Sequence, residues 1–344
     1  MAHNLTINRV GRAEMFYINE SPWHGLGTKL EKVATSKEAL VAASLDWPVH
    51  VEPLFLGNGR RVSEFRATVR ADTGEALAIV GTRYEPIQNV EAFRFLDALV
   101  GEAKAMYHTA GSLRGGRKVW IQARLPKELV IVPGDVAEKF LLLVNSHDGE
   151  SAMVCRFVAT RVVCQNTLAA ALREHGASRQ VSVRHTRSAA GRVDEARRVL
   201  GLSLRYFDVF GERCQAMSAK NLTRKMLDEY LTMVVPMPVA GRDSSHVRDT
   251  HHVLAHLFET GRGNETPKVR GTLWAAYNAV TEYVDHVRGV RKDGGLRRNW
   301  EESALFGSGD ALKQRAYLAA VAVLDEGVAS RFWRRLRGTV SQPV

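Results

Sequence analysis

The first half of the chain shows the alternation of apolar and polar residues that is typical of half-buried strands. Val62–Ala71 alternates in this way after the turn residues Gly57-Asn58-Gly59. Asp72-Thr73-Gly74 then leads into the apolar run Ala76–Val80. Because a short turn with Asp and Gly joins the two runs, we expect an antiparallel hairpin here.

Two more pairs of strands are expected around turns that contain glycine. The first turn is the basic, glycine-rich segment Gly111–Gly116, and the second is His147-Asp148-Gly149. The flanking strands are expected at Lys104–Ala110, Lys118–Leu125, Phe140–Ser146 and Met153–Val163. A further strand is expected at Gln180–His185.

Helical spacing of apolar residues appears between these strands and then dominates. Asn89 is a suitable cap for a helix with apolar positions at Val90 and Phe93. Thr167–Glu174 also has a helical pattern, and Asn166 is among the residues expected to cap it. From residue 188 onward, helices are expected at Val193–Met217, Leu222–Val234, His246–Thr260, Arg270–Val287 and Asp310–Phe332.

These elements predict the α+β class, with an amino-terminal, mostly antiparallel β-sheet with backing helices, followed by a helical carboxy-terminal part. We place the sheet domain at residues 1–187, a helical domain at 188–337 and a flexible tail at 338–344. Strands and helices do not alternate regularly, so a doubly wound dinucleotide-binding fold is disfavoured.

Composition is that of an ordinary globular protein, with one exception. Of 344 residues, 45% are hydrophobic and 25% charged, which excludes disordered, collagenous and disulfide-stapled classes. The three cysteines, Cys155, Cys164 and Cys214, form no CxxC pair, which favours a reducing compartment. The pattern shows neither a membrane span nor a secretory signal, so we expect a cytoplasmic protein. The exception is a formal net charge of +11, which indicates a polyanionic partner.

Sequence motifs for catalysis are mostly absent. The chain lacks the phosphate-binding GxxxxGK[ST], the zinc-protease HExxH and the hydrolase GxSxG patterns. We therefore expect that the protein binds no cofactor. Whether it is an enzyme stays open, and the absence of these motifs favours a protein without catalytic activity. If the protein is an enzyme, His147 and Asp148 are candidate acid–base or magnesium-binding groups, with Glu282 and Asp285 as partners across a polar pocket. Asn, Ser, Asp and Gly around His147 favour a structural turn instead.

One histidine pair has the spacing of a metal site. His252 and His256 lie four residues apart, so on a helix they share one face and can bind a zinc ion together. His246, Asp249 or Glu259 would supply a third ligand. A solvated or partly buried helix that is rich in histidine is the favoured interpretation, so no metal site is assigned.

Arginine-rich segments with aromatic residues between them indicate nucleic-acid binding. Arginine carries most of the charge, and its planar guanidinium suits phosphate and stacking contacts. A basic groove with aromatic platforms is the general means of binding single strands without reading sequence. The expected contact residues are Arg114, Arg117, Lys118, Trp120, Arg156, Arg161, Arg184 and Arg187. The alternative is a solvated basic exterior.

Several segments together resemble a known family. They are Pro22–Thr28, Tyr84–Asn89, Gly116–Trp120, Asn145–Gly149, Arg161–Thr167 and Trp274–His286. They are similar to a family of phage- and plasmid-related proteins classed as a domain of unknown function. That family has itself been compared with the single-strand annealing proteins of the RecT, Red-beta and Rad types. The resemblance implies a bacterial host cell, a curved antiparallel sheet and assembly into rings or filaments.

The sequence thus leaves three hypotheses in order of preference. The first is a non-enzymatic protein of a phage or mobile element that binds and anneals single-stranded DNA in recombination or replication. Its partners would be single-stranded DNA, further copies of itself, and phage or host replication and recombination proteins, with no membrane. The second is a metal-assisted nuclease or hydrolase centred on His147 and Asp148. The third is an accessory factor that counters host defence by binding a protein.

Overall fold

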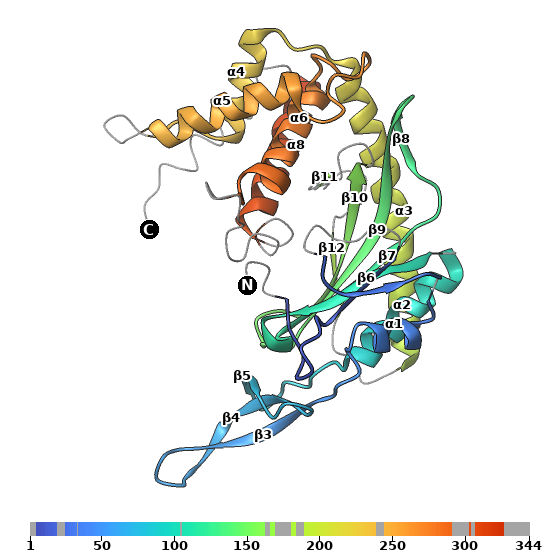
Figure 1. Cartoon of the computed structure of the whole chain (residues 1–344), viewed down its shortest axis with the longest axis vertical. Helices are drawn as coiled ribbons and strands as arrows, with labels where there is room; N and C mark the ends of the chain where they lie inside the picture. Colours follow the sequence, from blue (N-terminus) through green and yellow to red (C-terminus); the bar gives the residue numbers. More distant parts are fainter. Residues whose placement is uncertain are drawn as a thin grey trace.

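The computed structural model describes residues 5–18, 25–32, 34–103, 105–161, 166–168, 180–183, 189–238, 244–290, 303 and 307–326. Strands occupy the amino-terminal half, and helices dominate the carboxy-terminal half, which confirms the predicted α+β class (Figure 1). The molecule is elongated. A three-stranded sheet lies at one end, a nine-stranded sheet in the middle and a group of helices at the other end.

The nine-stranded sheet is antiparallel except for one pair. Along its main path the order is β11-β10-β9-β7-β6-β1-β2, with β12 also beside β10 and β8 beside β9. Only β1 and β2 run parallel among its described pairs. The strands are β1 (Met15–Ile18), β2 (Thr28–Leu30), β6 (Met106–Leu113), β7 (Lys118–Arg124), β8 (Leu129–Val132), β9 (Asp135–Ser146), β10 (Met153–Arg161), β11 (Asn166–Leu168) and β12 (Gln180–Val183).

One face of this sheet forms the core. Strand alternation places Ile121, Leu143 and Cys155 in cross-strand register on the same face, and all three are fully buried. This face packs against α1 (Ser36–Ala42), α2 (Asn89–Ala103) and the long helix α3 (Ala189–Ala219) (Figure 1). The opposite face carries two smaller apolar clusters, and half-buried Trp120 packs against both.

The carboxy-terminal helices extend the same core. They are α4 (Arg224–Val234), α5 (Ser245–Thr260), α6 (Leu273–Glu282), the π-helical turn η2 (Tyr283–Val287) and α8 (Ser308–Glu326). Every residue of α6 is buried, and the Trp274 indole donates a hydrogen bond to Asp135 Oδ2 at the start of β9 (2.8 Å). These helices confirm the predicted ones over the described residues. None of the described helices combines the length and apolar character needed to cross a bilayer.

The three-stranded sheet projects from the end of the molecule opposite these helices, and we call it the arm (Figure 1). It consists of β3 (Val49–Phe55), β4 (Arg61–Arg70) and β5 (Ala76–Gly81), in the order β3-β4-β5. The predicted hairpin around Asp72-Thr73-Gly74 is therefore confirmed, because β4 and β5 pair across it. The turn Gly57–Gly59 joins β3 to β4 at the tip of the arm.

Two details differ from the sequence-based expectations. Asn166–Leu168 forms β11 instead of starting a helix, because its backbone pairs with Ala159–Arg161 of β10 at the sheet edge. The residues 169–174 of that expected helix lie outside the described residues. In addition, β6 continues through Leu113, so the turn after it is shorter than the expected segment Gly111–Gly116. This strand position requires glycine, because the Trp120 indole occupies the space that the Cβ atom of any other residue would need.

Candidate nucleic-acid interface

The turn between β6 and β7 presents two of the expected phosphate contacts. Arg114, Gly115 and Gly116 form the 3-10 turn η1, and all three have positive φ, at 55°, 72° and 101°. A Cβ atom on Gly116 would lie 2.9 Å from the Trp47 ring, so only glycine fits there. This tight turn leaves the side chains of Arg114 and Arg117 exposed at the end of the sheet next to the arm.

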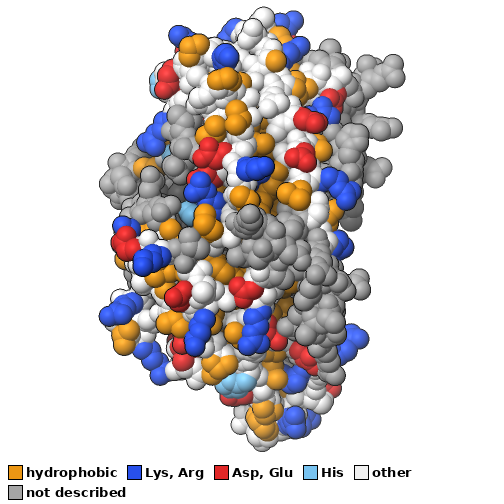
Figure 2. Space-filling model, turned by 90° about the vertical axis from the view of Figure 1, so that its right-hand side faces the viewer, with side chains coloured by type: hydrophobic (Ala, Val, Ile, Leu, Met, Phe, Trp, Pro, Cys, Tyr) orange, Lys and Arg blue, Asp and Glu red, His pale blue; other side chains and the backbone are white. Residues whose placement is uncertain are grey.

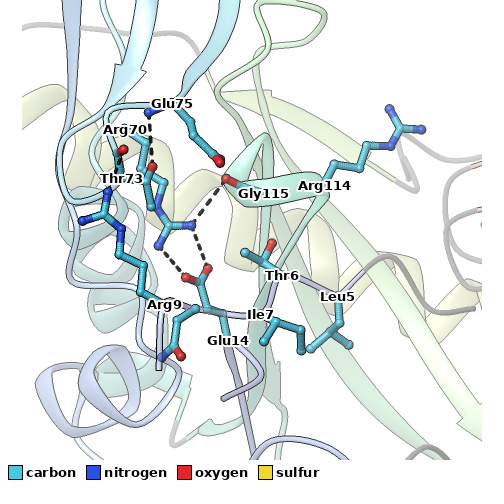
Figure 3. A pocket seen from close by; sticks show the side chains of 11 residues that line it. Leu5, Thr6, Ile7, Arg9, Glu14, Arg70, Thr73, Glu75, Arg114 and Gly115 are labelled. Atoms are coloured by element: carbon cyan, nitrogen blue, oxygen red, sulfur yellow. Dashed lines mark hydrogen bonds and ion pairs between the residues drawn. The ribbon is translucent and has the colours of Figure 1, made fainter. Parts of the chain in front are cut away.

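A hollow of about 500 Å³ lies between this turn, the arm and the amino-terminal segment (Figure 3). Its lining is mixed, with apolar, hydroxyl, cationic and acidic side chains from Leu5–Arg9, Glu14, Arg70, Thr73, Glu75, Arg114 and Gly115. Arg9 Nη2 donates to the Thr73 carbonyl oxygen (2.7 Å), which ties the amino-terminal segment to the arm. The Arg114 side chain points away from the ion pair between Arg70 and Glu14, which also lines the hollow (Figure 3).

That ion pair fixes the arm to the sheet. The Arg70 guanidinium, 2% exposed, donates two hydrogen bonds to the fully buried Glu14 carboxylate, one of them from Nη1 at 3.1 Å. It also donates to both Asp72 oxygens (2.7 and 2.9 Å) and lies 4.1 Å from the Trp47 ring centroid. Burial by itself would lower the pKa of Arg70, but its bonds to Asp72 and Glu14 outweigh burial and raise that pKa. The guanidinium is therefore a permanent structural cation.

His147 and Asp148 form a structural turn between β9 and β10. His147 is fully buried, and its Nε2 donates to Asn89 Oδ1 (2.9 Å) at the start of α2. Its carbonyl oxygen accepts a bond from the Thr68 hydroxyl of the arm (2.9 Å). Asp148 Oδ1 accepts bonds from the Ser146 hydroxyl and from the backbone N–H of Glu150. Both side chains thus stabilise the turn and its contacts with the arm and α2.

The same turn holds a tyrosine in its protonated form. Tyr84 donates its hydroxyl hydrogen to the Ser146 carbonyl oxygen (3.0 Å). Burial, and then the negative charge of Asp148, raise the pKa of Tyr84 to about 12. The phenol therefore stays neutral at physiological pH and serves as a hydrogen-bond donor to the turn.

Glu282 and Asp285 lie in another part of the molecule. Their helix contacts Asp135 at the start of β9 through Trp274, whereas His147 follows the end of that strand. Glu282 Oε2 accepts the backbone N–H of Arg262 (3.0 Å). Asp285 accepts a bond from the fully buried Lys313 (2.8 Å). The four candidate catalytic residues do not form one cluster.

Three of the expected contact residues share the sheet face opposite α3. Lys118, Trp120 and Arg156 are all half-buried there. Lys118 Nζ is 3.9 Å from Glu150, and Arg156 Nη1 is 3.5 Å from Asp310 of α8. Arg161 ends β10, opposite Ala137. Arg184 and Arg187 lie outside the described residues. Carboxylates thus accompany the cations of this face.

The histidine pair of α5 gains no further ligand. His252 and His256 are both exposed on that helix. Within the described part of the chain, no three His, Cys, Asp or Glu side chains come together as a metal-binding group. The absence of a metal site at these histidines stays a prediction.

The arm adds residues that the sequence analysis missed. Phe55, Phe65 and Ile79 are 59%, 50% and 68% exposed, which is high for large apolar side chains. Arg60 and Arg61 are exposed beside the tip. The signal in the sequence was the apolar run Leu54–Leu56 directly before a glycine turn, where a hairpin end is normally polar.

Figure 2 shows basic and acidic side chains interspersed on the side that lies to the right in Figure 1, with no area of one sign. At its lower end, where the arm lies, hydrophobic, basic and acidic side chains are next to one another. Within the arm, the exposed cations next to exposed apolar side chains are Arg60 and Arg61 at the tip.

Comparison with known proteins gives the family. Residues 76–304, about two thirds of the chain, match the model of a domain of unknown function, DUF932. None of the curated proteins and none of the solved structures shows significant similarity to the chain. The match includes β5, the central strands β6–β10 and helices α2–α6. The chain belongs to the DUF932 family of domains of unknown function.

Proposed function

We propose that this protein binds single-stranded DNA without cleaving it and anneals complementary strands as a homo-oligomer. The resemblance of its sequence to phage- and plasmid-related proteins supports a role in the recombination or replication of a mobile element. The formal net charge of +11 supports a polyanionic partner. Annealing requires a surface that holds phosphates and leaves bases free to pair, and it requires neither a nucleotide nor a metal ion.

One observation carries the proposal. The β6–β7 turn places exposed Arg114 and Arg117 at the end of the sheet from which the arm projects, with Arg9 on the other side of the hollow. Guanidinium groups bind phosphate oxygens well, and the arm that projects from this end carries exposed Phe65 and, at its tip, exposed Phe55. Basic groups next to aromatic platforms are the combination that single-strand binding requires.

The nuclease alternative has less support from the geometry. A metal-assisted nuclease needs several carboxylates around one or two metal ions. The turn at His147 uses Asp148 for its own hydrogen bonds, whereas Glu282 and Asp285 bind the Arg262 backbone and Lys313 instead. Buried His147 donates to Asn89, so its imidazole is committed to packing.

Binding to a fluorescent single-stranded oligonucleotide, measured by anisotropy over a series of salt concentrations, tests the proposal. The wild-type affinity should fall steeply with salt, because bound phosphates release counterions. The double variant Arg114→Ala, Arg117→Ala should bind more weakly, and its salt slope should decrease by about 0.7 for each lost phosphate contact. Exposed Arg205 on α3 provides the matched control, Arg205→Ala, which should bind like the wild type.

Two results would contradict the proposal. One is the absence of binding by the wild-type protein at low salt. The other is cleavage of the oligonucleotide on addition of Mg²⁺ or Mn²⁺, which would favour the nuclease. If the wild type binds and the arginine variant keeps its affinity and slope, these two side chains are not the phosphate contacts.

A further inference from the structure

The tip of the arm carries exposed apolar and exposed cationic side chains side by side in the sequence. Phe55 and Leu56 are 59% and 44% exposed, although no described part of the chain covers them. Arg60 and Arg61 follow after the glycine turn and are exposed as well. In the sequence, no acidic residue lies between Pro53 and Ser63. The tip is therefore both apolar and cationic.

Strand register places an aromatic ring and a guanidinium on the same side of the tip. Phe55 is paired directly with Arg61, so their side chains project from the same face of the β3–β4 ladder. Leu56 begins the turn itself, and its N–H donates to the Arg60 carbonyl oxygen (2.8 Å). This hydrogen bond fixes the backbone of the tip. The apolar side chains of the tip nevertheless stay exposed to solvent.

A second exposed apolar site lies further along the arm. Ile79 is paired with Ala67, and Phe65 is two residues from Ala67, so Phe65 and Ile79 share one face. Both are at least half exposed. The base of the arm is held in place by the Arg70–Glu14 pair and the bond from Thr68 to His147. The arm therefore presents its exposed rings on an anchored support.

We propose that the arm is a base-stacking wedge for single-stranded nucleic acid, with Phe55 and Leu56 between or against bases and with Arg60 and Arg61 on the adjacent phosphates. The proposal rests on the proposed function and names the element that contacts the bases. Aromatic rings stack on any base, so such contacts bind strands without reading their sequence. Apolar wedges on protruding elements unstack neighbouring bases in the same way.

Charge and shape favour a nucleic acid over a lipid surface as the occupant. A surface that binds either a nucleic acid or an anionic lipid needs positive charge, which Arg60 and Arg61 supply. A flat bilayer would meet only the tip of a projecting hairpin, whereas a single strand that follows the arm can contact Phe55 and also Phe65. The single-strand proposal thus uses both exposed apolar sites.

Substitutions at Phe55 separate stacking from simple apolarity. Phe55→Trp keeps a stacking ring and should bind a fluorescent single-stranded oligonucleotide with wild-type affinity or better. Phe55→Leu keeps an apolar side chain without a ring and should bind at least about 5-fold more weakly, the lower limit for the loss of one stacked base. Arg60→Ala with Arg61→Ala should weaken binding and lower the salt slope. The matched controls are Leu204→Ala and Arg205→Ala, both exposed on α3.

The outcomes distinguish this inference from the proposed function. If the wild type binds the oligonucleotide and Phe55→Leu binds equally well, the wedge is wrong and the proposed function stands. If the wild type binds no oligonucleotide, both are wrong. Binding to vesicles of phosphatidylserine and phosphatidylcholine that is lost in Phe55→Leu, with unchanged binding to the oligonucleotide, would assign the tip to a membrane surface and overturn the inference. Thermal melting of each variant confirms that the fold is intact.

Discussion

Arg70 and Glu14 show how one buried pair determines the position of the arm. We predict that Glu14→Gln destabilises the protein by about 3 kcal/mol, at the low end of the cost of removing one partner from a buried ion pair. The guanidinium, 2% exposed, would lose its buried counter-charge and keep only Asp72. Urea unfolding, followed by circular dichroism, measures this change in the free energy of unfolding.

An exposed pair provides the control for this prediction. Glu31 is 79% exposed and lies 3.3 Å from Lys29. Glu31→Gln should change stability by less than about 1 kcal/mol, because solvent screens exposed ion pairs. Equal effects of the two substitutions would mean that the buried pair does not hold the arm to the sheet.

The sequence predicted the contacts of single residues less well than it predicted helices and strands. Glu14 and Arg70 are 56 positions apart, and neither stands in a motif, so only the tertiary structure brings them together. Trp120, which is among the expected nucleic-acid contacts, lies over Gly111 and packs against the apolar clusters of the sheet, so its role as a contact stays a prediction. Neighbouring sequence cannot distinguish a ring that packs from a ring that is exposed, because both fit the alternation of a strand.

At the scale of elements, periodicity was a better guide. The helices of the carboxy-terminal half and the hairpins around Asp72 and His147 follow from local spacing and turn residues, and the structure has them. Strand β11 was missed because its pairing with β10, and not its own sequence, decides its conformation. The division into domains at residue 187 stays a prediction, and one hydrophobic core includes residues from both sides of it.

Helix α3 allows a prediction that concerns the element itself. Gly201 is exposed in its interior, and a Cβ atom there would meet nothing within 4 Å. Gly201→Ala should therefore stabilise the protein by roughly 0.5–1 kcal/mol, because alanine loses less backbone entropy in a helix than glycine does. Chemical denaturation of the two proteins measures the difference.

A second glycine on the same helix is the matched comparison. A Cβ atom on Gly211 would lie 2.7 Å from Leu129 Cδ1 of β8, so the leucine side chain has to move. Gly211→Ala should gain less stability than Gly201→Ala or lose some. Adding Leu129→Ala should remove this difference between the two glycine positions. An equal gain at both positions in the wild-type background would show that α3 does not pack closely on β8.

The whole molecule carries far more positive than negative charge, but unevenly. Most of the surplus lies in arginine-rich segments outside the described residues, at 184–187, 291–298 and 331–337. Arg184 and Arg187 therefore stay predictions as phosphate contacts. Within the described residues, Lys118 and Arg156 each lie close to a carboxylate. Arg114 and Arg117 of the turn and Arg60 and Arg61 of the arm tip are exposed, and they are the described cations to which we assign phosphate contacts.

This charge leads to a prediction about assembly. At +11 per chain, copies of the protein repel one another, and a long single strand would neutralise this charge while it holds several copies side by side. We predict that adding a long single-stranded oligonucleotide shifts the protein to an earlier elution volume in size-exclusion chromatography, and that negative-stain images show rings or filaments. High salt should reverse the shift, because the phosphate contacts are electrostatic.

A protein that elutes unchanged with and without the strand at low salt would contradict assembly on DNA. An oligomer that forms equally without DNA and persists at high salt would instead mean that apolar contacts between copies, and not phosphate neutralisation, hold the assembly together.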